Sequence, residues 1–145
     1  MSTYASLTIS VYDLDESTFD AFIREPFLDD ESFFDMFEGH VVCDWEYLAG
    51  DNGEQFGQML TDSDVKWRPF DVLPALGKLT EKYPEALVKI RVCWTNGDDG
   101  DDCRVSYCYV KNGKYFTPEI RIIVEEFDEA MMKPIAGGFY DDGNL

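Results

Sequence analysis

The amino-acid sequence predicts an α+β fold in which an antiparallel sheet carries its helices on one face. Strand-like and helix-like runs follow the order β-α-(α)-β-loop-α-β-β-β, and the last three strand-like runs come one directly after another. The chain has 145 residues, 45% of them apolar or aromatic, which suits one domain with a sizeable core. We therefore expect a single α+β domain over residues 1–145.

The first strand and helix follow from apolar spacing. Residues 7–11 alternate apolar and polar side chains, which indicates a half-buried strand. Phe19, Phe22 and Ile23 then fall at i, i+3 and i+4, the spacing of one buried helix face. A Ser-x-x-Asp capping signal stands at the start of this run, so we expect a short helix that ends near Pro26.

Weaker patterns follow along the chain. A second short helix is expected over residues 30–37, with Gly39 marking its end. Residues 41–48 have the pattern of another strand. Residues 49–64 are rich in Gly, Asp and Asn, which favour turns. We expect them to form a long loop with little regular structure.

A longer helix is expected between Pro69 and Pro84. Large apolar residues recur there at near-helical spacing: Phe70, Leu73, Leu76, Leu79 and Tyr83. Proline lacks a backbone N–H and is tolerated only in the first turn of a helix. Pro74 therefore predicts that the helix begins near Leu73.

Three strands are expected after this helix. Residues 87–94 and 103–110 are strand-like and are joined by the acidic loop 95–102. Asn112-Gly113 accepts the positive φ angles of a type I′ hairpin turn and is the strongest local signal in the chain. Residues 115–124 are expected to form the returning strand.

Three short motifs connect this part of the chain to a known family. They are Lys66-Trp67-Arg68-Pro69, Lys82-Tyr83-Pro84-Glu85 and Lys111-Asn112-Gly113-Lys114. With the two strands that accompany them, residues 66–115 resemble the ferredoxin-like domain family found in small plasmid- and phage-borne proteins. The resemblance covers about a third of the chain. It implies a ferredoxin-like fold and a mobile-element origin, and it implies no active site.

Charge is unevenly distributed along the chain. Residues 1–64 hold sixteen acids and one base, Arg24, a net −15, while the other fourteen acids and eleven bases give −3, for a total of −18. Like charges repel one another in the compact state and destabilise it. We therefore expect the acidic half of the chain to bind a positively charged partner. A sequence pI near 4.1 argues against binding to nucleic-acid phosphates, which requires Lys and Arg.

No secretory signal, membrane span or metal site is predicted. Residues 1–10 have neither a basic region nor a long apolar run, and no stretch approaches the roughly 20 apolar residues that cross a bilayer. We therefore expect a cytoplasmic protein with reduced thiols, with a disulfide between Cys93 and Cys103 across a hairpin as the alternative. No Cys-x-x-Cys pair occurs, and His40 is not spaced with the cysteines for zinc, so no metal or cofactor is expected.

The remaining patterns favour neither catalysis nor calcium binding. The sequence has one histidine, no Ser-His-Asp arrangement and no Gly-rich phosphate loop. Pairs of carboxylates are then the remaining candidates for acid–base catalysis. In a chain with thirty acids such pairs arise by chance, so they do not indicate an active site. Residues 96–102 hold closely spaced carboxylates of the kind that Ca²⁺ binds, but they lack the Glu and the flanking helices of an EF-hand. We interpret them as a polar hairpin tip and keep a Ca²⁺-binding module as an alternative. No enzyme activity is expected.

Six acids are predicted to bind a partner. Glu16 and Asp20 stand at i, i+4, and Glu31 and Asp35 repeat that spacing, which on a helix is about 5–6 Å and comparable to the distance between neighbouring phosphates. Large aromatic residues between these acids can anchor them rigidly. The predicted set is Glu16, Asp20, Asp29, Asp30, Glu31 and Asp35.

The sequence therefore predicts an acidic, non-enzymatic inhibitor that blocks a basic protein surface. Its carboxylates would act as a DNA mimic and occupy sites meant for phosphates. The family resemblance implies a host defence protein that handles nucleic acid as the target, and hence an anti-restriction or anti-CRISPR role. An immunity protein that neutralises a cognate toxin has the same electrostatics and is the alternative. The oligomeric state is left open.

Overall fold

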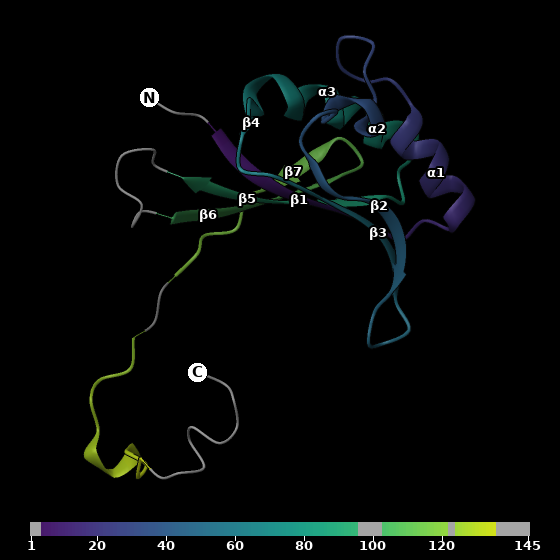
Figure 1. Cartoon of the computed structure of the whole chain (residues 1–145). Helices are drawn as coiled ribbons and strands as arrows, with labels where there is room; N and C mark the ends of the chain where they lie inside the picture. Colours follow the sequence, from purple (N-terminus) through teal and green to yellow (C-terminus); the bar gives the residue numbers. More distant parts are fainter. Residues whose placement is uncertain (1–3, 96–102, 122–123, 136–145) are drawn as a thin grey trace.

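The computed structural model describes residues 4–95, 103–121 and 124–135 (Figure 1). Its elements follow one another as β1 (Tyr4–Tyr12), α1 (Glu16–Arg24), α2 (Phe33–Met36), β2 (Val41–Ala49), β3 (Gln55–Thr61), β4 (Val65–Lys66), α3 (Pro69–Lys82), β5 (Leu87–Thr95), β6 (Cys103–Lys111), β7 (Lys114–Phe116) and the 3₁₀ turn η1 (Glu129–Met131). The seven strands form one antiparallel sheet in the order β2-β3-β1-β5-β6-β7, and β4 pairs with the start of β1. Helices α1, α2 and α3 all lie on one face of the sheet (Figure 1). The predicted α+β architecture is confirmed.

β1 is the central strand of the sheet. Its side chains alternate between the two faces, and Leu7, Ile9 and Val11 on the helical side are at most 1% exposed. Ile9 lies opposite Met59 of β3 and Ile90 of β5, and all three are fully buried. Because directly opposed residues share one face of a sheet, the core lies between these three strands and the helices.

The two short helices of the first half form where the sequence predicts them. α1 begins after Asp15, whose carboxylate accepts a hydrogen bond from the Thr18 N–H at 2.7 Å, and it buries Phe19. α2 has only four residues and is shorter than the predicted helix over residues 30–37. The difference arises because residues 28–31 form a separate tight turn before it.

The prediction of an irregular loop over residues 49–64 is wrong. β3 occupies Gln55–Thr61 and pairs with both β1 and β2. Its glycine and polar residues weaken the strand pattern of the isolated segment, and pairing along both edges stabilises it. Gly57 stands in the middle of this strand because a Cβ atom there would overlap the ring of Phe19.

α3 begins at Pro69, not near Leu73 as predicted, and it keeps Pro74 inside the helix. Pro69 occupies the first turn, where no N–H is needed, whereas an interior proline costs roughly 3 kcal/mol. The burial of Leu76 and Leu79 offsets this cost. With 14 residues, α3 is the longest helix described, and no helix in the described ranges is long and apolar enough to cross a membrane.

The strands of the second half match the prediction up to Phe116. β5 and β6 form the two expected strands, and Asn112 and Gly113 have φ angles of 46° and 76°, as a type I′ turn requires. The predicted strand over residues 115–124 is wrong for residues 117–121 and 124, since β7 ends at Phe116. Pro118 explains the end of the strand, since it cannot donate a hydrogen bond to a ladder.

The β5–β6 register separates two cysteines that the sequence allowed to face each other. Cys93 lies opposite Val105, and Cys103 lies opposite Thr95. The two residues are therefore diagonal neighbours across the β5–β6 ladder and not a directly opposed pair.

Replacing Gly57 tests how α1 packs on the sheet. Gly57→Ala is expected to destabilise the protein by about 1–3 kcal/mol, because the new methyl group overpacks against the Phe19 ring. Gly77→Ala in α3 is the matched control, since its Cβ would have no neighbour closer than 3.8 Å. It is expected to stabilise the protein by about 0.5–1 kcal/mol. Urea unfolding followed by circular dichroism measures both, and equal effects would contradict the packing described.

Candidate interaction surface

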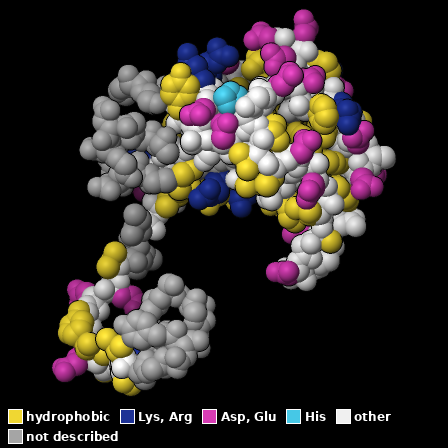
Figure 2. Space-filling model, viewed as in Figure 1, with side chains coloured by type: hydrophobic (Ala, Val, Ile, Leu, Met, Phe, Trp, Pro, Cys, Tyr) yellow, Lys and Arg dark blue, Asp and Glu magenta, His cyan; other side chains and the backbone are white. Residues whose placement is uncertain are grey.

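Charge is segregated across the sheet. Residues 1–64, which include β1, β2, β3, α1 and α2, hold sixteen acids and one base. Strands β5, β6 and β7 hold no acid and five bases, Lys89, Arg91, Arg104, Lys111 and Lys114. Asp and Glu side chains gather over α1 and the segment that joins α1 to α2 (Figure 2). Among the described helices and strands, acids therefore concentrate on β2, α1 and α2, and bases concentrate on β5–β7.

Glu16 and Asp20 stand one turn apart on the exposed side of α1. Asp20 Oδ1 accepts a hydrogen bond from Arg24 Nε at 3.0 Å, but both side chains are more than half exposed, so this ion pair is weak. The opposite side of α1 is fixed, because the buried ring of Phe19 packs on Tyr47 with 5.6 Å between centroids. α1 thus holds its two carboxylates in solvent on a firmly packed helix.

Asp29 and Asp30 form the tip of a tight turn over residues 28–31, here called the acidic hairpin. Both have positive φ angles, 51° and 63°. The turn is closed by hydrogen bonds from the Glu31 N–H to the Leu28 carbonyl at 2.9 Å and from the Leu28 N–H to the Glu31 carbonyl at 3.3 Å. Aspartate enters this left-handed region more readily than most residues. The turn therefore holds two adjacent carboxylates in exposed positions.

Ser32 and Phe33 anchor the acidic hairpin to the core. Phe33 is 1% exposed and packs on the ring of Phe27 with 4.8 Å between centroids. Ser32 caps α2, since its Oγ accepts a hydrogen bond from the Asp35 N–H at 3.3 Å and donates one to Asp35 Oδ2 at 3.2 Å. Asp35 therefore stabilises the start of α2 in addition to carrying surface charge.

All six acids of the predicted set are exposed, but they do not form one helical ladder. The prediction of a helical pair for Glu31 and Asp35 is wrong, because Glu31 precedes the cap of α2 and belongs to the acidic hairpin. Glu16 lies at the start of α1, one turn from Asp20 and about 12 Å along the helix axis from Arg24 at 1.5 Å per residue. Arg24 in turn lies 4.3 Å from the ring centroid of Phe34, which places the end of α1 against α2.

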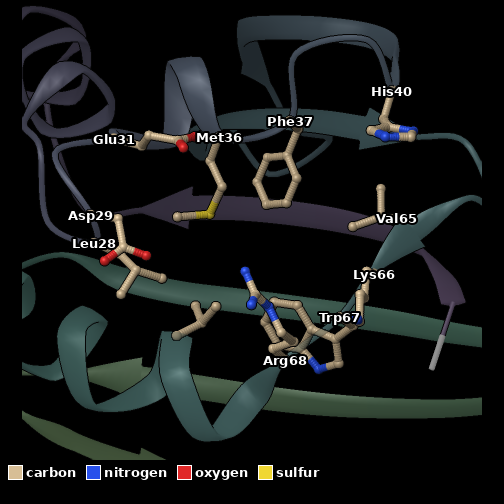
Figure 3. Close-up of a pocket in the computed structure, with 11 residues that line it drawn as sticks. Leu28, Asp29, Glu31, Met36, Phe37, His40, Val65, Lys66, Trp67 and Arg68 are labelled. Atoms are coloured by element: carbon tan, nitrogen blue, oxygen red, sulfur yellow. The ribbon is translucent and has the colours of Figure 1, made fainter.

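A cavity of ≈ 230 Å³ lies between the acidic hairpin, β4 and the start of α3 (Figure 3). Asp29 and Glu31 line it from one side, and Lys66 and Arg68 line it from the other. Sequence reasoning missed these two bases, although they stand in the Lys66-Trp67-Arg68-Pro69 motif used for the family resemblance. Across the cavity, none of the four groups forms an ion pair with another. The hairpin carboxylates therefore keep their charge available to a partner.

His40 is at the rim of this cavity, with its Nδ1 at 3.1 Å from Asp62 Oδ1. The cavity lining contains no Ser, Thr or Cys, so it offers no hydroxyl or thiol nucleophile beside the histidine. Within the described ranges, no group of three or more His, Cys, Asp or Glu side chains is placed to hold a metal ion. The acidic loop for which calcium binding is the alternative, residues 96–102, lies outside the described residues.

The cap of α1 gives a pH-dependent prediction. Hydrogen bonds from Thr18, chiefly from its backbone N–H, hold the pKa of Asp15 below its ordinary value of 3.8. Asp15→Ala is therefore expected to lower the melting temperature at neutral pH. Because the pKa is lower in the folded state, this stabilisation is present above pH 3.8 and is lost as the pH falls through the folded value.

Melting temperatures measured by calorimetry across this pH range check the effect of Asp15→Ala. Asp51→Ala, in the exposed turn between β2 and β3, is the control and is expected to differ little from the wild-type protein at every pH. A loss for Asp15→Ala that remains the same below pH 3.8 would contradict the capping role.

The comparisons with known proteins identify no relative. No protein-family model matches the chain, and neither a curated protein nor a solved structure matches it. The resemblance of residues 66–115 to the ferredoxin-like family therefore stays a prediction, and function rests on the charges and contacts described above.

Proposed function

We propose that this chain is a non-enzymatic cytoplasmic protein whose acidic surface binds a basic protein surface. The acidic surface consists of Glu16, Asp20, Asp29, Asp30, Glu31 and Asp35. One observation carries the proposal: within the described part of the chain, the exposed side chains of Glu16, Asp29, Asp30 and Glu31 make no hydrogen bond or ion pair. Unpaired like charges held together raise the free energy of the folded state, and a cationic partner relieves that repulsion.

The rigid support of these carboxylates favours a specific contact. The acidic hairpin is anchored through Phe27 and Phe33, and α1 is anchored through Phe19. A carboxylate that is already held in position loses little conformational entropy on binding. Charge-assisted hydrogen bonds to Arg or Lys are also roughly twice as strong as neutral ones. The acidic surface is therefore suited to occupy Lys and Arg sites that otherwise bind phosphates, with fast and salt-sensitive association.

The strand order supports a ferredoxin-like assignment, which is part of the proposal. Apart from the short elements α2 and β4, the chain from β1 to β5 follows the β-α-β-β-α-β order typical of that fold. In the sheet these four strands lie in the order β5-β1-β3-β2. The phage or plasmid origin in the proposal rests on the resemblance of the motifs in residues 66–115. The proposed target is accordingly a host defence protein that handles nucleic acid, such as a restriction or CRISPR effector.

Neutralising the acidic surface is expected to abolish target binding. The variant changes its four Asp to Asn and its two Glu to Gln, which keeps side-chain size and the tolerance of positions 29 and 30 for left-handed backbone. Immobilised protein is incubated with bacterial lysate, washed at low and then high salt, and analysed by mass spectrometry. We expect the wild-type protein to retain nucleic-acid-handling proteins that salt or duplex DNA releases. The variant is expected to retain at least about tenfold less, a loss of roughly 1.4 kcal/mol.

A matched control distinguishes the effect of losing the acidic surface from the effect of losing net negative charge. It neutralises six other exposed acids, Asp13, Glu46, Asp51, Glu54, Asp64 and Glu85. Both variants have the same net charge, so an equal loss of binding by both would assign the effect to overall charge and contradict the proposed surface. Undiminished capture by the first variant would overturn the proposal. Capture of a single toxin nuclease would instead support the immunity-protein alternative.

A further inference from the structure

The sheet face opposite the helices is aromatic and basic. The register defines it: Lys89 lies opposite Ser10 and Tyr109, and Arg91 lies opposite Thr8 and Tyr107, away from the buried row of β1. We call this surface the open face. Its large side chains are Tyr12, Phe56, Leu87, Lys89, Arg91, Tyr107, Tyr109 and Phe116. Lys and Arg side chains are visible on this underside of the sheet (Figure 2).

The side chains of the open face pack on one another. Lys89 Nζ lies 5.2 Å from the centroid of the Tyr107 ring, and the rings of Tyr109 and Phe116 stack with 6.3 Å between centroids. On the other side of β1, the rings of Tyr12 and Phe56 stack at 5.2 Å. The face thus presents ordered aromatic surface together with positive charge.

A hollow of ≈ 420 Å³ opens at the β7 end of this face. Leu87, Tyr109 and Phe116 give it apolar walls, and Lys111 and Lys114 stand at its edge. Since β5, β6 and β7 contain no acid, the lysines have no carboxylate from these strands beside them. The chemistry of the hollow suits a ligand that combines apolar side chains with carboxylates.

Residues 119–135, here called the distal segment, have this chemistry. Six large apolar side chains in its described part are between 48% and 82% exposed: Ile120, Val124, Phe127, Met131, Met132 and Ile135. The segment also holds five acids and two bases; the acids are Glu119, Glu125, Glu126, Asp128 and Glu129. So much exposed apolar surface in one stretch marks an interaction site. The distal segment leaves the sheet on the side of the open face and extends away from the body (Figure 1).

We propose that the distal segment of one copy of this chain binds the open face of a second copy, and that the exchange is reciprocal. Charge complementarity supports this pairing, because an acidic segment meets four bases of the open face, Lys89, Arg91, Lys111 and Lys114, on strands without acids. The methionines and Phe127 cover the aromatic rings and the hollow, where thioether–aromatic contacts are favourable. Reciprocal exchange buries each segment and each face, and it closes as a two-fold dimer.

The path of the chain favours a second copy over the chain's own sheet. Pro118 follows the end of β7 closely and biases the residue before it to an extended conformation, which directs the segment outward. Met131 and Met132 donate their N–H groups only to Asp128 and Glu129 of the same turn. Single-stranded nucleic acid is the other ligand that aromatic, basic surfaces accept, and the net charge of −18 disfavours it.

Sedimentation of the full-length chain tests the dimer. The wild-type protein is expected to be dimeric at micromolar concentration. Reversing the face charges (Lys89→Glu with Arg91→Glu) or the segment charges (Glu125→Lys with Glu126→Lys) is expected to weaken the dimer at least tenfold. Combining both reversals is expected to restore it. The control Asp51→Lys with Glu54→Lys makes the same charge change as the segment reversal, but at the β2–β3 turn, and is expected to leave the dimer unchanged.

Crosslinking of the unmodified chain gives a second test that does not depend on any variant folding. Equal amounts of ¹⁵N-labelled and unlabelled protein are mixed, and a carbodiimide links neighbouring Lys and Glu side chains. Links from Lys89 or Lys111 to Glu125 or Glu126 are expected to join labelled to unlabelled copies. Such links found only within one copy would overturn the exchange. A monomer at all concentrations would also overturn it, as would a monomer that binds single-stranded DNA in fluorescence anisotropy.

Discussion

The pairing of β1 with β3 on one edge and β5 on the other is the constraint on which the remaining structure depends. The buried row of β1 meets Met59 and Ile90 and forms the floor on which all three helices pack. At the end of β3 a side chain of this strand also bonds to β1, since the Leu7 N–H donates a hydrogen bond to Thr61 Oγ1 at 2.8 Å. α1 then depends on β3 directly, because its Phe19 ring lies over Gly57. Loss of either neighbouring strand would remove the surface that buries the helices and orients the acidic surface.

Local signals in the sequence predicted those parts of the fold that local interactions determine. The Asn112-Gly113 turn requires only two residues with positive φ, and α1 requires a cap and an apolar face within nine residues. β3 could not be predicted in this way, because its stability comes from two partner strands distant in sequence. The prediction from Pro74 that α3 begins near Leu73 is wrong for the same reason. Burial of apolar side chains of α3 against the sheet outweighs the local cost of a proline inside the helix.

The six acids could be chosen from charge alone, but their arrangement could not. Sequence spacing suggested a second helical pair, whereas Asp29 and Asp30 lie in a left-handed turn that only the bridge between Leu28 and Glu31 reveals. The open face did have a sequence signal, because bases and tyrosines recur at every second position of β5 and β6. Its significance depends on the strand register, which places these residues together on the side without helices.

β1 leaves the ribosome long before β5, its second partner strand, has been made. At about 5–20 residues per second, several seconds pass in which the apolar row of β1 lacks that partner. Exposed strand edges of this kind favour association between unfinished chains. Residues 1–64, which are already synthesised by then, carry a net −15, and repulsion between nascent copies opposes such association. The acidic first half is therefore expected to keep unfinished copies apart until β5 completes the sheet.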